Sequence, residues 1–234
     1  MIRQIDRRHA VTALAVLGLC GVSRVGAVPA LPSLATIDGS AIRNWPAPDT
    51  ARILQAPCVV IVGAPDADIT IVELFDYNCG YCKHAAAELD QVLRDDGRIT
   101  LALINNPFLS AGSTGAARVQ AAVKKLAGAR SAYRFHLALM QSPGQANERR
   151  ALDVAQSIGL DRAPLIRTMT DANIASQIRQ QKLFATDSHL PITPTFIMGG
   201  VAFAGWPGVA TMVRFVAAAR RCGSLHCGDS GQSR

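Results

Sequence analysis

The stretch FDYNCGYCKHAAAEL, residues 75–89, decides the fold of this protein. Its two cysteines, Cys79 and Cys82, stand three positions apart, where an apolar run gives way to helix-forming residues. Such a pair could be half of a zinc site, a structural disulfide or a redox pair. The choice depends on the compartment, on the flanking elements and on a proline more than a hundred residues away.

The first thirty residues have the layout of a secretory signal. A basic start, MIRQIDRR, precedes about a dozen apolar residues, and small residues follow in VGAVPA. The apolar run stops before Arg24, short of the roughly 18 residues that a spanning helix needs. We therefore expect residues 1–30 to be a signal peptide of the Sec type or, because of Arg7-Arg8, of the Tat type. Its removal would leave a periplasmic protein.

The charge pattern gives little support for nucleic-acid binding. The 234 residues carry a net charge of +7, and without residues 1–30 they keep 20 Lys and Arg and 16 Asp and Glu, a net charge of +4. Basic doublets at 124–125, 149–150 and 220–221 are scattered and lack interleaved aromatic residues. This is the pattern of solvated helix faces.

Export would allow the cysteines to form disulfides, because disulfides form and persist outside the cytosol. The mature chain keeps an odd number of them, so at least one should be free or pair only transiently. The five are Cys58, Cys79, Cys82, Cys222 and Cys227.

The first half of the chain predicts a strand–helix–strand unit. Residues 31–56 bear Pro and Ala without a sustained period, which indicates an irregular N-terminal extension. Within residues 57–110, a short strand at 59–62 precedes a buried strand at 69–75. A helix runs from Cys79 to Gly97, and a second buried strand follows at 99–104. The two strands flanking the helix should be parallel, with a right-handed crossover.

The second half returns to strands only after a long helical stretch. Residues 111–187 predict a helical insertion, and residues 188–221 predict two short strands joined by Gly199-Gly200 and then a last helix. Residues 222–234 read as a flexible tail. The whole order predicts an α/β protein, a thioredoxin fold with an inserted all-helical subdomain. The expected insertion helices are 114–127, 130–141, 148–158, 162–169 and 173–185, with N-caps at Asn147 and Asp161 and ends at Gly128 and Gly159.

The position of the cysteine pair favours redox chemistry. Cysteines at i and i+3 that open a helix lie on one side of its first turn. The sulfur of Cys79 should face unpaired backbone N–H groups and the positive end of the helix dipole. These stabilise a thiolate, so the pKa of Cys79 should fall by one or more units from about 8.5. Cys82, one turn further in, should be more buried and act as the resolving thiol.

Two motifs, VELFDYNCGYCK (72–83) and TPTFIMGG (193–200), make the chain resemble the DsbA-like family of thiol–disulfide oxidoreductases from about residue 64 to 221. The resemblance implies that Glu73 is a buried acid handling protons beneath the cysteines. It also implies a redox-active disulfide between Cys79 and Cys82, and a cis-proline loop at Thr193-Pro194 that receives the substrate chain. Judged from the residues alone, Glu73 could be solvated on an edge strand, and Pro194 could begin a strand with a trans peptide bond.

Other interpretations are weaker. A zinc site with Cys222 and Cys227 would have loose spacing, and these two suit a structural disulfide or a second pair better. Cys58 fits a buried small hydrophobe. Lys83 and His84 could add positive charge near Cys79 but fit solvated helix positions.

The direction of electron flow stays open. The Gly80-Tyr81 dipeptide and Thr193 resemble the DsbC-like isomerase branch, but residues 31–56 are too short for the dimerisation domain of that branch. We expect an oxidase acting on exported proteins with cysteines, without a cofactor or metal. A quinone-coupled membrane partner would reoxidise it, and a membrane electron donor would serve a reductase or isomerase instead. A redox-inert thioredoxin-like binding module or chaperone is the alternative of a different class.

Overall fold

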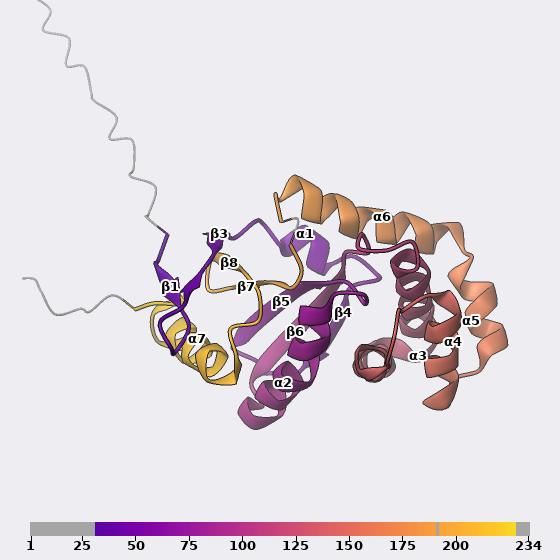
Figure 1. Cartoon of the computed structure of the whole chain (residues 1–234), viewed down its shortest axis with the longest axis horizontal. Helices are drawn as coiled ribbons and strands as arrows, with labels where there is room; N and C mark the ends of the chain where they lie inside the picture. Colours follow the sequence, from indigo (N-terminus) through magenta and orange to yellow (C-terminus); the bar gives the residue numbers. More distant parts are fainter. Residues whose placement is uncertain (1–30, 191, 228–234) are drawn as a thin grey trace, which may run out of the picture. The chain divides into compact units, whose positions relative to one another are not determined.

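The computed structural model describes residues 31–190 and 192–227. The expected signal peptide lies outside the described residues, as does the end of the expected tail, residues 228–234. The core is a six-stranded sheet in the order β3-β8-β7-β5-β6-β4 (Figure 1). Its strands are β3 (Asn44–Pro46), β4 (Val60–Gly63), β5 (Ile69–Phe75), β6 (Ile99–Asn105), β7 (Thr195–Met198) and β8 (Val201–Ala204).

The strand–helix–strand unit has the predicted form. β5 and β6 are parallel, from Ile69 opposite Ile99 to Phe75 opposite Asn105, and α2 (Gly80–Asp96) connects them. α2 ends at Gly97, whose φ of 69° is the left-handed conformation that suits glycine at a helix C-terminus. The neighbouring pair β5–β7 is antiparallel, so β5 lies inside the sheet with a partner on each side.

Alternation along β5 divides the core into two layers. Ile71 and Phe75 belong to the large cluster that α2, α3 and α7 cover, whereas Val72 and Leu74 belong to the smaller cluster under α1 and α6. Because successive side chains of a strand point to opposite faces, Glu73 shares the face of Ile71 and Phe75. Its carboxyl therefore points to the side of the sheet that α2 covers.

The insertion is helical, as predicted, and follows β6 (Figure 1). Gly128, with φ of 82° and ψ of 175°, interrupts α3, so that two helical segments stand where two were expected. The side chain of Asn147 caps α4 by accepting a hydrogen bond from Arg150 N at 2.9 Å. Asp161 stands at the N-cap of α5 without such a bond. The helices are α3 (Ser113–Gln141), α4 (Glu148–Ser157), α5 (Arg162–Met169) and α6 (Ala172–Asp187).

The C-terminal part closes the sheet. β7 and β8 form an antiparallel hairpin whose connection, Gly199-Gly200, has φ values of 56° and 75°, the conformation of a primed turn. The last helix is α7 (Val209–Cys222). None of the helices in the described ranges has the length and apolar character that a membrane crossing requires.

The prediction of an irregular segment at residues 31–56 is wrong in part. β1 (Leu34–Ala35) and β2 (Ala41–Ile42) pair with each other, β3 joins the main sheet against β8, and α1 (Ala51–Leu54) forms a single turn. An edge strand offers unpaired backbone groups, and β3 supplies partners for those of β8. Segments of two to four residues are too short to show a period in the sequence.

Residues 222–227 do not form the flexible tail that was predicted for them. A disulfide joins Cys222 to Cys227, and Leu225 between them is only 2% exposed. Leu225 packs over the hairpin turn, where a Cβ on Gly199 would stand 3.1 Å from Leu225 Cδ2. The described part of this segment is therefore fixed to the sheet by a covalent ring and an apolar contact.

Candidate redox-active site

Cys79 is the N-cap of α2, the position that Ser, Asp or Asn usually occupies. Its backbone is extended, with φ of −80° and ψ of 114°, and its carbonyl accepts the hydrogen bond of Lys83 N at 3.0 Å. The Cys79 sulfur accepts a hydrogen bond from Cys82 N at 3.2 Å. The sulfur thus takes the place of a capping oxygen and faces the positive end of the helix dipole.

The cis-proline loop lies against the same sulfur. The Thr193–Pro194 peptide bond is cis, and the Cys79 thiol donates to the Thr193 carbonyl at 3.2 Å. The Pro194 carbonyl accepts a hydrogen bond from Gly205 N at 2.8 Å. Residues 114 positions apart in the sequence are thereby brought into contact.

These contacts set the protonation of Cys79. A hydrogen bond from the Cys82 thiol, with further ones from the Thr193 side chain and from the N–H groups of Cys82 and Tyr81, lowers the pKa of Cys79 to about 6 although burial opposes the shift. Cys79 is therefore largely a thiolate at neutral pH.

Cys82 has the opposite character. It is fully buried, and burial raises the pKa of its thiol well above the ordinary range, with the hydrogen bond to Cys79 and the charge of Glu73 acting in the same direction. Cys79 keeps 4% of its surface exposed and Cys82 keeps none. Both are free thiols in this structure, so it shows the dithiol form of the pair.

Glu73 is buried in the middle of the sheet and is not at an edge. Its exposure is 0%, and neither carboxyl oxygen has a hydrogen-bond partner among the described residues. Burial, together with the charge of Cys79, raises the pKa of Glu73 to about 8. A carboxyl in this environment holds a proton near neutral pH and can release it when its surroundings change.

Aromatic groups close the space around Glu73. Tyr77 and His136 are buried, with ring centroids 5.7 Å apart, and Phe75 meets both rings edge-on. Burial lowers the pKa of His136 to about 3, so this imidazole is neutral. The nearby charge of Glu73 adds to burial in raising the pKa of Tyr77. Both rings are therefore uncharged near neutral pH.

The two basic residues after Cys82 differ in role. Lys83 Nζ donates to the carbonyls of Ser142 at 3.3 Å and Gly144 at 2.9 Å, so it ties α2 to the loop after α3. His84 is largely exposed and lies 3.8 Å from Glu88, one turn along the helix.

The other cysteines stand outside this site. Cys58 is buried and receives a hydrogen bond from Gln181 Nε2 at 2.5 Å, while burial raises its pKa. Cys222 and Cys227 are bonded to each other. Within residues 31–190 and 192–227, no group of three or more His, Cys, Asp or Glu residues could hold a metal ion.

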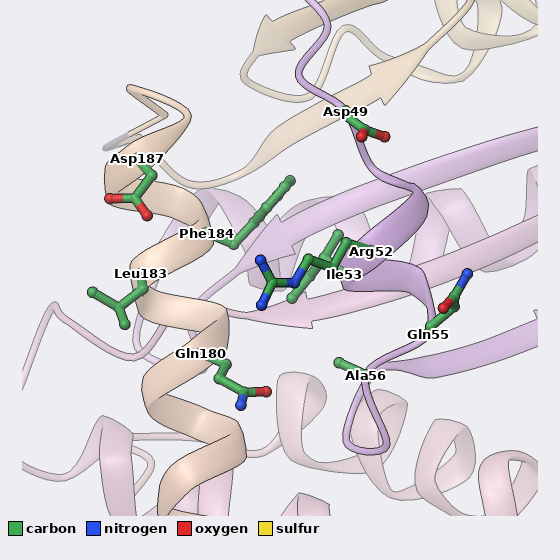
Figure 2. A pocket seen from close by; sticks show the side chains of 9 residues that line it. All are labelled: Asp49, Arg52, Ile53, Gln55, Ala56, Gln180, Leu183, Phe184 and Asp187. Atoms are coloured by element: carbon green, nitrogen blue, oxygen red, sulfur yellow. The ribbon is translucent and has the colours of Figure 1, made fainter.

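A separate cavity of about 440 Å³ lies between α1 and α6, with Arg52 and Phe184 extending into the space between the helices (Figure 2). Both helices cover the face of the sheet that carries Val72 and Leu74. This is the face opposite to α2, so the cavity is not part of the cysteine site.

Two residues that the sequence analysis left without a role lie next to the pair. The side chains of Asp76 and Asn78 connect the end of β5 to two distant loops through seven hydrogen bonds to residues beyond position 100. Polar residues between a strand and a helix are ordinary turn residues, so the only signal in the sequence was their closeness to Cys79.

Comparisons with known proteins agree with this architecture. The family profile described as thioredoxin matches residues 56–218. The chain belongs to the thioredoxin family. A thioredoxin-like oxidoreductase from Silicibacter pomeroyi DSS-3 is 31% identical, with a TM-score of 0.68, over 75% of this chain and 99% of that one. No curated protein sequence matches significantly.

More distant solved structures share the fold. The thiol–disulfide exchange protein alpha-DsbA2 from Wolbachia pipientis is 24% identical, with a TM-score of 0.66, over 72% of this chain and 90% of that one. A periplasmic thioredoxin-like protein from Salmonella enterica serovar Typhimurium is 21% identical, with a TM-score of 0.64, over 75% and 97% of the two chains. The predicted thioredoxin fold and the resemblance to DsbA-like proteins are confirmed.

Proposed function

We propose that the protein is a thiol–disulfide oxidoreductase whose redox centre is the Cys79–Cys82 pair. The observation that carries this proposal is the asymmetry of the pair. Cys79 is 4% exposed and has a pKa of about 6, whereas Cys82 is fully buried and its pKa is raised. Because the thiolate is both nucleophile and leaving group, the asymmetry makes Cys79 the sulfur that exchanges with a substrate.

In the oxidising direction, a substrate thiolate attacks Cys79 Sγ in the Cys79–Cys82 disulfide. A mixed disulfide forms, and Cys82 leaves as a thiolate that takes a proton, for which the buried acid Glu73 is the proposed donor. A second substrate thiolate then attacks the substrate sulfur of the mixed disulfide and expels Cys79 as a thiolate. The substrate gains a disulfide, and two electrons pass to the pair.

The Thr193-Pro194 loop is the proposed receptor for the substrate backbone. The Pro194 carbonyl is already bonded to Gly205, so the polar groups that this loop can offer belong to Thr193. An extended substrate chain that pairs with Thr193 would bring its cysteine next to Cys79.

We favour oxidation as the physiological direction. A stabilised Cys79 thiolate stabilises the reduced form by about 1.4 kcal/mol for each unit of pKa, which makes the disulfide more oxidising. The proposed substrates are cysteines of other exported proteins. A membrane partner coupled to quinone would reoxidise the pair. The layout of residues 1–30 and the periplasmic neighbour support export.

Equilibration of the pair with glutathione tests the direction. An oxidase predicts a reduction potential of about −120 mV for the pair, whereas a value of about −270 mV would show a reductant. Cys79→Ser should abolish exchange. Cys82→Ser should still accumulate a mixed disulfide with substrate, because only the resolving thiol is missing. Full function of Cys79→Ser would instead show a redox-inert binding module.

A further inference from the structure

Glu73 exchanges a proton with Cys82 in the proposed reaction, yet its carboxyl is 0% exposed. Because the pKa of Glu73 is about 8, the carboxyl is mostly protonated at neutral pH. It must therefore release its own proton before it can accept the one that Cys82 loses on reoxidation. In the other direction, it must regain the proton that it has given to Cys82. In both cases a proton has to cross other side chains between Glu73 and water.

Two more buried polar atoms, Tyr77 Oη and His136 Nδ1, lack a hydrogen-bond partner among the described residues. The packing of their rings requires neither atom. The Tyr77 ring meets Phe75 and Phe135 edge-on, at centroid distances of 5.1 and 6.1 Å. The His136 ring meets Phe75 edge-on at 4.7 Å. Phenylalanine at either position would keep such contacts without the cost of an unpaired buried polar atom, so the two polar atoms call for a role other than packing.

The polar rings continue from Glu73 toward the boundary between α2 and α3. The charge of Glu73 raises the pKa of Tyr77 and of Tyr133, so both phenols lie within its electrostatic reach. The His136 ring lies between these phenols in distance: its centroid is 5.7 Å from that of Tyr77 and 6.2 Å from that of Tyr133, on which it stacks. Tyr133 Oη on α3 donates to Asp90 Oδ1 on α2 at 2.9 Å.

Titratable or charged groups face both ends of this series. At the inner end, Cys79 and Cys82 interact with Glu73. At the outer end, the Asp90 side chain is 16% exposed and its Oδ2 forms an ion pair with Arg94, whose side chain is 64% exposed. The series thus begins at the buried carboxyl beneath the cysteines and ends at a carboxylate in contact with water.

We propose that Tyr77 and His136 conduct the proton of Glu73 to and from the surface between α2 and α3. Tyr133 and Asp90 form the outer end of this route. A phenol and a neutral imidazole can each accept one proton while they give up another, so no ring has to keep a charge. The inference rests on the proposed function and adds two residues that act through Glu73.

The route is used when the disulfide closes on reoxidation. The Cys79 thiolate attacks oxidised glutathione and forms a mixed disulfide, and one glutathione thiolate leaves. Cys79 then has no charge, so one of the two causes that raise the pKa of Glu73 is gone, and the carboxyl releases its proton outward. Glu73 takes the proton of Cys82, whose thiolate attacks Cys79 Sγ and expels the second glutathione thiolate. Two electrons pass from the pair to glutathione, and the proton that Glu73 released goes to one of the two thiolates.

The test follows this closing step in the reduced full-length mature protein after mixing with oxidised glutathione. Rapid acid quenching and mass analysis separate the mixed disulfide on Cys79 from the closed Cys79–Cys82 disulfide. Tyr77→Phe and His136→Phe should each slow the closing step about tenfold, because Glu73 loses its route to water. Formation of the mixed disulfide should stay within about twofold of the wild-type rate, because it uses a thiolate that already exists.

Combination with Glu73→Gln distinguishes proton conduction from a structural effect. Tyr77→Phe should slow the closing step no further in a Glu73→Gln background, because glutamine has no proton to exchange.

Urea titration and a matched variant guard against a folding defect. Tyr77→Phe should unfold at a higher urea concentration than the wild type, because it removes an unpaired buried hydroxyl. A slower closing step in a more stable protein cannot come from misfolding. Thr211→Val is the control: it removes another buried hydroxyl, on α7, and should leave the closing rate unchanged.

The possible results separate the two proposals. If the wild type closes its disulfide and both Tyr77→Phe and His136→Phe close at the same rate, the proton leaves past the cysteines. The inference is then wrong and the proposed function stands. Equal slowing by Tyr77→Phe with and without Glu73→Gln would also overturn the inference, because the effect would not pass through Glu73. Failure of the wild type to form the disulfide with oxidised glutathione would overturn the proposed function, and the inference with it.

Discussion

Among single residues, Glu73 and Cys79 have pKa values displaced in opposite directions. Burial without a hydrogen-bond partner among the described residues favours the neutral acid of Glu73, whereas hydrogen bonds to the sulfur favour the thiolate of Cys79. Near neutral pH the site therefore contains a proton on the carboxyl and a charge on the sulfur. This is the combination that exchange requires, because one sulfur must attack and the other must be protonated on leaving.

Replacement of Glu73 with glutamine tests the buried acid. The pKa of Glu73 is about 8 in the folded protein against about 4.5 unfolded. Its stabilising effect is fully present below pH 4.5 and is lost as pH rises toward 8, by at most about 1.4 kcal/mol per pH unit. The free energy of unfolding of the reduced wild type should therefore fall relative to Glu73→Gln across this window in urea titrations. Parallel pH profiles for the two proteins would contradict the burial of an ionisable carboxyl.

The sequence allowed the prediction of these residues to different degrees. Spacing alone placed Cys79 and Cys82 on the first turn of a helix, and the family resemblance added Glu73 and Pro194. Asp76 and Asn78 were not predicted because their partners, such as Phe108 and Ala146, are 32 and 68 positions away. Without a fold, no local pattern connects a turn residue to a loop at such a distance.

Among secondary-structure elements, the strands and helices from β4 onward were predicted well, whereas β1, β2, β3 and α1 were not. β5, with seven residues, has the predicted bounds, and α5 does also. Their apolar runs and their flanking Asp and Gly residues are sufficient signals. β3 depends on pairing with β8, a tertiary contact, so its three residues carry no period of their own.

The edge strand β4 depends on one glycine. Gly63 has φ of 140°, and a Cβ there would stand 2.3 Å from the Ile99 carbonyl oxygen across the β4–β6 pair. Gly159 also has positive φ, 88°, but has no atom within 4 Å of such a Cβ. Gly159→Ala should cost about 1 kcal/mol of unfolding free energy, and Gly63→Ala should cost clearly more, because a backbone clash is added. Equal urea midpoints for the two variants would contradict the close approach of Gly63 to the Ile99 carbonyl oxygen.

For the protein as a whole, the order of segments was sufficient to predict a thioredoxin fold with a helical insertion. What the sequence could not show is how residues 31–56 join the core. The pairing of β3 with β8 joins residues 44–46 to residues 201–203, which are remote in the sequence. The segment between β1 and β2 also contacts α7, where Ile37 N donates to Thr211 Oγ1 at 3.1 Å.

Removal of the Cys222–Cys227 disulfide should lower the stability of the protein without changing its rate of thiol exchange. The double variant Cys222→Ser with Cys227→Ser should lose about 2 kcal/mol of stability, since the ring of six residues limits the unfolded chain. Its rate of exchange with glutathione should equal that of the wild type, because the ring lies outside the Cys79 site. A slower exchange at unchanged fold would instead identify Cys222–Cys227 as a second redox pair.

The central claim is that Cys79 is a thiolate at neutral pH, and its own titration is the most direct test. The rate of alkylation of the reduced protein, or its absorbance at about 240 nm, is followed against pH, with Cys79→Ser as the blank. The claim predicts a single transition near pH 6, present in the wild type and absent in Cys79→Ser. A transition at or above the ordinary thiol value of about 8.5 would contradict it.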